Sequence, residues 1–170
     1  AGNFNNHFGV PYTLLGLTSK DRFLVLEMGT NHPGEIAYLS GLANADIALI
    51  SSVSMGHAGN FGSYEKIIDE KSDIVCGMKP GGLLFLHDDL SSNSLIIAKA
   101  AKYNIRIAGP VKITKPTRLD ENGTLFTYGG REVFLAAAGS HQFDNCRLAL
   151  AVIEHLAGIQ EASQAAAKLS

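Results

Sequence analysis

Continuous apolar runs alternate with helix-like segments over residues 22–109, and this alternation limits the possible folds more than any other feature. The apolar runs have the length and composition of strands buried on both faces of a parallel sheet. Strand and helix in alternation predict an α/β fold, with a mainly parallel sheet flanked by helices. We expect strands at 22–28, 45–52, 81–87 and 105–109, and helices at 34–44, 63–78 and 91–104.

The pattern changes after residue 109. Residues 111–137 have the composition of strands, and Gly129-Gly130 has the form of a two-residue hairpin turn. We therefore expect a small antiparallel β flap laid on the parallel core. Helical spacing returns at 141–158, where Gly158 is expected to end the helix, and a last short helix is expected at 161–170.

Composition narrows the class of protein. The chain has 170 residues, of which 46% are hydrophobic, and a net charge of −2, as expected for one ordinary soluble domain with a real core. No basic stripe is present, which argues against binding to nucleic acid or to an anionic membrane. Cys76 and Cys146 form no C-x-x-C pair, so we expect two reduced thiols in a cytoplasmic protein.

The helix expected at 63–78 places a lysine at the centre of its apolar face. At 3.6 residues per turn, Lys71 shares one side of the helix with Tyr64, Ile67, Ile68, Ile74, Val75 and Met78. The other charges, Glu65, Lys66, Asp69, Glu70 and Asp73, fall toward the sides or the back, where water can reach them. Lys71 is therefore expected to be the one inward-facing charge of this helix.

Two interpretations of Lys71 are open. The side chain can extend its ammonium to the edge of the apolar face, or burial can lower the pKa of its amine. A neutral lysine amine can take up carbon dioxide and become a carbamate. This exchange replaces a cation with a carboxylate, which is the kind of ligand that a magnesium site needs.

Polar residues also collect where the expected strands end, which is where open α/β sheets bind ligands. Glu27 ends the first strand, His57 follows the second, and His87, Asp88 and Asp89 follow the third. Taken singly, Glu27 can be a solvated carboxylate, His57 an exposed loop residue, and the Asp88-Asp89 pair turn or cap chemistry. Glu27, His57 and Lys71 are nevertheless placed to converge on one spot.

Four stretches together resemble the central domain of the Mur ligases. They are GNFNNHFGVPYTLL (2–15), EMGTNHPGEI (27–36), HAGNFGSYEKIIDEKSDI (57–74) and GSHQFDN (139–145). The H-x-x-x-F-G-S spacing followed by a lysine is typical of the superfamily. The E-M-G-x-N-H-x-G-E-I element resembles the member that joins D-alanyl-D-alanine to UDP-N-acetylmuramoyl-tripeptide.

The resemblance implies a role for each matching residue. Glu27 would be a magnesium ligand near the ATP phosphates. His57 would help to hold a second magnesium, and Lys71 would be the carbamylated lysine that completes that second site, with Lys71 and His57 as the catalytic residues. The substrate-facing residues would be Asn3, Asn5 and Asn6 in one loop, and Asn31, His32 and Glu35 by the active site. The adenine of ATP would be met by His141, Gln142 and Asn145, although many Mur ligases carry Asn where Gln142 stands.

The implied reaction is ATP-dependent amide formation through an acyl phosphate, in the synthesis of peptidoglycan precursors for the cell wall. We expect ATP and Mg2+ as cofactors, UDP-N-acetylmuramoyl-tripeptide and D-alanyl-D-alanine as partners, neither nucleic acid nor membrane, and a cytoplasmic monomer. No G-x-x-G-K-S/T phosphate loop occurs in residues 1–170. We therefore expect a central-domain fragment that lacks the P-loop and the N- and C-terminal domains and is inactive alone.

Three alternatives stay open at this point. The chain could belong to another amide ligase of the superfamily that uses a different amino acid or peptide. It could be a non-catalytic pseudo-enzyme module without a P-loop. It could also be a metal-dependent hydrolase that uses Glu27, His57 and Asp88.

Overall fold

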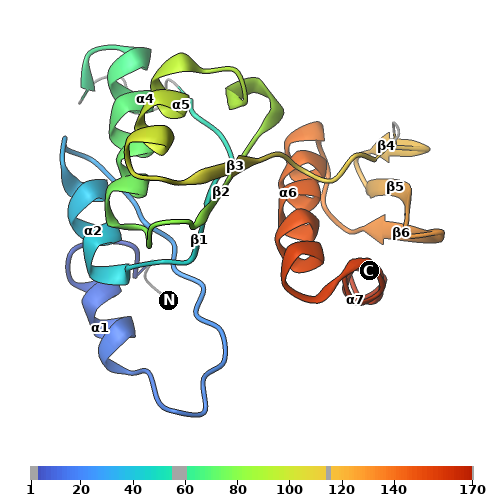
Figure 1. Cartoon of the computed structure of the whole chain (residues 1–170). Coiled ribbons are helices and arrows are strands. Elements are labelled where there is room, and N and C mark those ends of the chain that lie inside the picture. Colours follow the sequence, from blue (N-terminus) through green and yellow to red (C-terminus); the bar gives the residue numbers. More distant parts are fainter. Residues whose placement is uncertain (1–3, 55–60, 114–115, 170) are drawn as a thin grey trace. The chain divides into compact units, whose positions relative to one another are not determined.

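The computed structural model describes residues 4–54, 61–113 and 116–169 (Figure 1). Two compact units are present, one formed by residues 1–84 and 92–107 and the other by residues 85–91 and 108–170. The elements of the chain are α1 (Gly9–Leu15), α2 (Glu35–Ala43), β1 (Ile47–Ile50), α4 (Tyr64–Ser72), the 3-10 helix η2 (Asp73–Gly77), β2 (Leu83–Leu86), the 3-10 helix η3 (Asp88–Leu90), α5 (Ser94–Lys102), β3 (Arg106–Ala108), β4 (Arg118–Asp120), β5 (Gly123–Tyr128), β6 (Arg131–Leu135), α6 (Ser140–Ala157) and α7 (Ile159–Ala166).

The first unit is built on a parallel sheet with the strand order β1-β2-β3. All four residues of β2 are buried, as expected for a central strand covered on both faces. Helices α2, α4 and α5 lie together beside this sheet (Figure 1). The α/β fold and the strands expected within 45–52, 81–87 and 105–109 are therefore confirmed.

The strand expected at 22–28 does not form. These residues have no assigned secondary structure, and Phe23 and Val25 are 66% and 93% exposed. A strand requires a neighbour that supplies the hydrogen-bond ladder, and no described strand pairs with this segment. The apolar composition of residues 22–28 indicated that this segment can be buried, but composition does not show whether a neighbouring strand is available to pair with it.

Helix α1 was not anticipated from the sequence. Asn6 starts it, because its side-chain Oδ1 accepts hydrogen bonds from the backbone N–H groups of Phe8 and Gly9, each across 3.0 Å. Gly9 is required where the chain turns back on itself, since a Cβ there would lie 2.4 Å from the Cα of Phe4. The loop that holds Asn5 and Asn6 is thereby fixed against the start of α1.

Helix α4 begins where the sequence indicated. The Ser63 hydroxyl accepts a hydrogen bond from the backbone N–H of Lys66 across 3.3 Å, which caps the first turn. The α-helix ends at Ser72, earlier than the expected 78, and the chain continues as the 3-10 helix η2. Lys99 of α5 pairs with Asp69 and Asp73, so charged contacts tie α5 to α4 and η2.

The second unit contains the antiparallel sheet β4-β5-β6. Tyr128 pairs with Arg131 across the two-residue turn, and Gly129 and Gly130 both have positive φ, so the predicted hairpin is confirmed. The apolar side of this sheet packs against α6 and α7. The cluster consists of Phe126, Tyr128, Val133, Phe143, Cys146, Leu150, Ala162 and Ala166.

No helix within the described ranges is long and apolar enough to cross a membrane. Both cysteines are free thiols, with Cys146 buried in α6 and Cys76 partly buried in η2. Burial raises the pKa of the Cys146 thiol to about 11. Cys146 is therefore a structural thiol of the core.

We expect Cys146 to resist alkylation by iodoacetamide while the protein is folded. The thiolate is the reacting form, and the raised pKa lowers its fraction at pH 8 roughly a hundredfold relative to an unperturbed thiol. Peptide mass spectrometry on a Cys76→Ser variant should show rapid labelling of Cys146 only after denaturation in guanidinium. Equal labelling rates in the folded and denatured protein would show that Cys146 is not buried in solution.

Candidate active site

The first pair of candidate residues meets through a direct hydrogen bond. Asn5 Nδ2 donates to Glu27 Oε1 across 2.9 Å, and the Asn5 backbone carbonyl accepts from the N–H of Gly29 across 2.7 Å. The Glu27 side chain remains exposed, so a ligand can still reach its carboxylate. A predicted substrate residue and a predicted metal ligand are thus neighbours.

The other asparagines of the N-terminal loop differ from Asn5. Asn6 has its side-chain oxygen engaged at the start of α1, so the group that it can offer a ligand is the amide N–H₂. Asn3 lies outside the described residues. The expectation that Asn3, Asn5 and Asn6 face the substrate stays a prediction.

Glu35 organises the turn that precedes α2. Its Oε2 accepts the backbone N–H of Asn31 across 2.6 Å and that of His32 across 3.1 Å. The Asn31 N–H is the largest cause that holds the pKa of the Glu35 carboxyl below its usual value. The side chains of Asn31 and His32 stay exposed, so Glu35 shapes the turn that presents them.

Glu70 is the residue that the sequence analysis misplaced. We expected it on the side of α4 that water reaches, but its side chain is 3% exposed, so Lys71 is not the one inward-facing charge of the helix. The Glu70 carboxylate accepts from the N–H of Gly34 at 2.6 Å and of Ile36 at 2.9 Å. The cause is α2, which packs against α4 and covers that side of the helix.

Lys71 is partly buried on α4, as its place on the apolar face indicated. Ile67, Ile68 and Val75 on the same side are at most 5% exposed. The Lys71 ammonium donates to the backbone carbonyl of Ser52 across 2.9 Å, and burial lowers the pKa of its amine. Among the described residues, no carboxylate pairs with this cation.

The convergence of Glu27, His57 and Lys71 stays a prediction, because His57 lies outside the described residues. Within the described part of the chain, no three His, Cys, Asp or Glu side chains are placed to hold a metal ion.

The second unit carries the residues expected to meet adenine. His141 and Asn145 are exposed and lie one turn apart on α6, so they share one side of the helix. Gln142 is partly buried, and its backbone N–H bonds to the Gly139 carbonyl across 3.1 Å. The exposed pair has the access that contact with a base requires.

A charged network that the sequence did not indicate holds the start of α6. Arg147 donates from Nη1 to Asp88 and to Asp144, each across 3.0 Å, and from Nε to the Val111 carbonyl across 3.2 Å. His87 Nε2 lies 3.5 Å from Asp144 Oδ2. These contacts connect the 3-10 helix η3 to the turns of α6 that carry the predicted adenine residues.

The Asp88-Asp89 pair serves in a turn, as its simpler interpretation indicated. Both aspartates lie in η3. The backbone N–H of Asp89 donates a hydrogen bond to His87 Nδ1 across 3.2 Å, which caps the start of η3. The following helix α5 is capped by Asn93, whose Oδ1 accepts the N–H groups of Leu95 and Ile96. The Asp88 carboxylate accepts a hydrogen bond from Arg147 Nη1 across 3.0 Å.

A family model described as the Mur ligase middle domain matches residues 1–153. The chain belongs to this family. The resemblance found in the sequence is thereby confirmed.

Two relatives of this Mur ligase middle domain carry the same name. The UDP-N-acetylmuramoyl-tripeptide–D-alanyl-D-alanine ligase of Bacillus subtilis is 34% identical over 153 residues, which cover 88% of this chain and 33% of that protein. The Haemophilus influenzae ligase of the same name is 30% identical over 181 residues, covering 99% and 40%. The chain thus spans well under half the length of either relative.

A solved structure matches the whole chain. The crystal structure of MurF from Acinetobacter baumannii aligns with a TM-score of 0.87 at 28% sequence identity, and the match covers 100% of this chain and 39% of that one. The Thermotoga maritima MurF ligase in complex with ADP aligns with a TM-score of 0.72 at 24% identity, which supports the fold.

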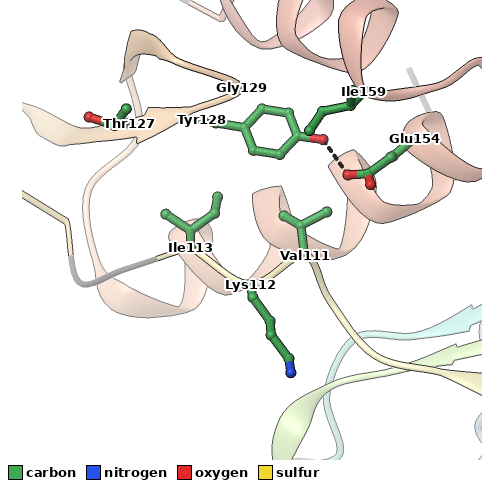
Figure 2. Close-up of a pocket in the computed structure, with 8 residues that line it drawn as sticks. All are labelled: Val111, Lys112, Ile113, Thr127, Tyr128, Gly129, Glu154 and Ile159. Atoms are coloured by element: carbon green, nitrogen blue, oxygen red, sulfur yellow. Dashed lines mark hydrogen bonds between the residues drawn. The ribbon is translucent and has the colours of Figure 1, made fainter.

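A crevice of about 340 Å³ lies in the second unit, and none of the predicted site residues lines it. Figure 2 shows the Tyr128 ring close to Ile159, Val111 and Ile113, with the hydroxyl directed at Glu154. That hydroxyl donates to Glu154 Oε2 across 2.7 Å, and burial raises the Tyr128 pKa well above its usual value. The crevice is lined by Val111, Lys112, Ile113, Thr127, Tyr128, Gly129, Glu154 and Ile159.

Proposed function

We propose that this Mur ligase middle domain is part of an ATP-dependent ligase that joins D-alanyl-D-alanine to UDP-N-acetylmuramoyl-tripeptide in peptidoglycan precursor synthesis. The observation that carries the proposal is the 30–34% identity, over 88–99% of the chain, to curated ligases of that name. We further propose that the protein works in the cytoplasm as a monomer, where ATP and nucleotide-linked precursors are available.

The proposed reaction has two steps. The terminal carboxylate of the tripeptide attacks the γ-phosphorus of ATP, forming an acyl phosphate and releasing ADP. The amine of D-alanyl-D-alanine then attacks the acyl carbon, the amide bond forms, and inorganic phosphate leaves with the loss of one proton. In the first step the protein mainly positions the reactants and offsets charge.

Glu27 would hold one magnesium near the ATP phosphates, and His57 with a carbamylated Lys71 would hold a second; magnesium supplies positive charge beside the phosphate oxygens. The partial burial of Lys71 supports the modification, because its lowered pKa raises the neutral fraction of the amine. The ammonium first loses one proton, and the neutral amine then adds to carbon dioxide and loses a second proton, so –NH3+ becomes –NH–COO−. The carbamate keeps one N–H, which leaves the bond to the Ser52 carbonyl possible.

The substrate would be met from two loops. The loop of Asn3, Asn5 and Asn6 would face the muramoyl-peptide, and Asn5 supports this by its bond to Glu27. Asn31 and His32 would contact the substrate from the turn that Glu35 holds. His141, Gln142 and Asn145 would meet the adenine of ATP, and the exposure of His141 and Asn145 supports that role.

The test uses a complete protein that carries this chain, with ADP release measured in a coupled assay and the product measured by mass spectrometry. ADP release and the amide product should require magnesium, UDP-N-acetylmuramoyl-tripeptide and D-alanyl-D-alanine together. Turnover with a different amino acid or peptide in place of D-alanyl-D-alanine would identify another amide ligase of the superfamily. No ATP turnover with any acceptor would identify a pseudo-enzyme.

A further inference from the structure

The N-terminus of α2 has no cap of its own. The N-cap residue is Gly34, with φ of 89° and no side chain, although the first N–H groups of a helix have no partner within the helix. Glu70, from a different helix, accepts two of these N–H groups, those of Gly34 and Ile36. A carboxylate that is 3% exposed is retained in a core only where such bonds compensate its lost hydration.

Glu70 also holds the far side of the same turn. Thr30 Oγ1 lies 3.0 Å from Glu70 Oε1 and also 3.0 Å from the His32 carbonyl oxygen, and its single proton is donated to one of these acceptors at a time. The three contacts of Glu70 therefore bracket Asn31 and His32, with Thr30 before them and Gly34 and Ile36 after them. Glu35 accepts from the N–H groups of Asn31 and His32 themselves, so Glu70 holds both ends of this turn and Glu35 holds its middle.

Helix α4 joins this turn to the candidate metal-site lysine. Glu70 directly precedes Lys71, and neighbouring residues of a helix project about 100° apart. Glu70 bonds to the turn before α2, while Lys71 bonds to the Ser52 carbonyl after β1. Since both side chains belong to the same rigid helix, a shift of α4 moves both contacts together.

We propose that Glu70 is a positioning residue that sets where Asn31 and His32 meet the substrate relative to Lys71. The proposal rests on the proposed function for the identity of that substrate. Its structural basis, the three bonds from a buried carboxylate to residues 30–36, is independent of the reaction.

The first test is Glu70→Gln in the complete ligase. Glutamine keeps the size of the side chain, but its amide nitrogen can only donate, so one of the contacts that Glu70 makes is lost. The KM for UDP-N-acetylmuramoyl-tripeptide should rise roughly tenfold or more, as expected for a lost bond to a charged group. The KM for ATP and kcat should change by less than about threefold. Glu65→Gln, at an exposed site on the same helix, is the matched control and should match the wild type.

The second test needs no substrate. Amide hydrogen exchange at Gly34 and Ile36 should accelerate in Glu70→Gln by about tenfold or more, while exchange in β2 stays unchanged. Thr30→Val, which removes one hydroxyl, should shift the tripeptide KM in the same direction by less, and it serves if Glu70→Gln does not fold.

The outcomes separate the two proposals. If the wild type forms no amide, the proposed function fails, whereas the exchange result still reports on the turn. Unchanged exchange at Gly34 and Ile36 would overturn the positioning role. An equal loss for every substrate, together with a lowered melting temperature, would show a general structural role and also overturn it.

Discussion

Lys71→Ala should reduce the turnover of the complete ligase more than about a hundredfold, because loss of a metal ligand exceeds the 10–100-fold typical of residues that only support a ligand. Lys71→Arg should be no better. Arginine keeps the positive charge, stays protonated at every accessible pH and does not form a carbamate. Lys71→Glu restores a carboxylate on a shorter side chain and should retain a little activity.

The pKa of Lys71 gives this prediction its direction. Burial lowers the pKa in the folded protein, so the neutral amine that reacts with carbon dioxide is more abundant than for an exposed lysine at the same pH. As pH falls further below this pKa, the amine protonates and the carbamate is lost. Activity should therefore fall with falling pH and with removal of carbon dioxide, and added bicarbonate should restore it.

Added acetate offers a sharper test. A small carboxylate can occupy the space left in Lys71→Ala and supply the missing oxygens, so acetate should raise the activity of this variant and not that of the wild type. Lys66→Ala, an exposed site on the same helix, is the control and should behave as the wild type. If Lys71 only extends to the surface, arginine will be tolerated and acetate will have no effect. An active Lys71→Arg enzyme would exclude the carbamate.

A strand of the parallel sheet could be predicted where an apolar run also has a neighbouring strand to pair with. The run at 81–87 became β2, which is buried along its whole length. The run at 22–28 has the same apolar character and became neither strand nor core. A strand depends on its neighbours through the ladder, and a single sequence does not state which segments lie side by side.

Helix α4 shows the same limit at the level of one residue. Periodicity located its apolar face and the partial burial of Lys71, because those depend only on the helix itself. It missed Glu70, because α2 covers a second side of α4. The available signal was Gly34, a helix start without a capping side chain, which requires an acceptor from elsewhere in the fold.

The candidate site also has a part that the sequence could predict, its residue types, and a part that it could not, the contacts between them. Glu27 and Asn5 were singled out from the sequence, but their mutual hydrogen bond depends on how two loops meet. The network of Arg147 with Asp88 and Asp144 gave no signal, since its members are spread over 60 positions of loop and helix. Residue types could be predicted from the resemblance, whereas contacts between loops needed the fold.

Glu27→Ala should reduce the turnover of the complete ligase more than about a hundredfold and shift its magnesium dependence to higher concentration. The side chain is exposed, so the melting temperature should change little, as for other surface substitutions. His57→Ala, at a residue outside the described ranges, should have the same two effects.

The Asn5→Ala variant distinguishes a metal-ligand role of Glu27 from a purely electrostatic role of its charge. Asn5→Ala removes the donor to Glu27 Oε1 but leaves the carboxylate, so it should shift the magnesium midpoint by less than Glu27→Ala does. Glu121→Ala, an exposed acid in the turn between β4 and β5, is the control for loss of one negative charge. Raising magnesium should partly restore Asn5→Ala, because the ligand is still present, and should restore Glu27→Ala much less. Near-normal magnesium dependence in Glu27→Ala would show that Glu27 is not a metal ligand, whatever its turnover.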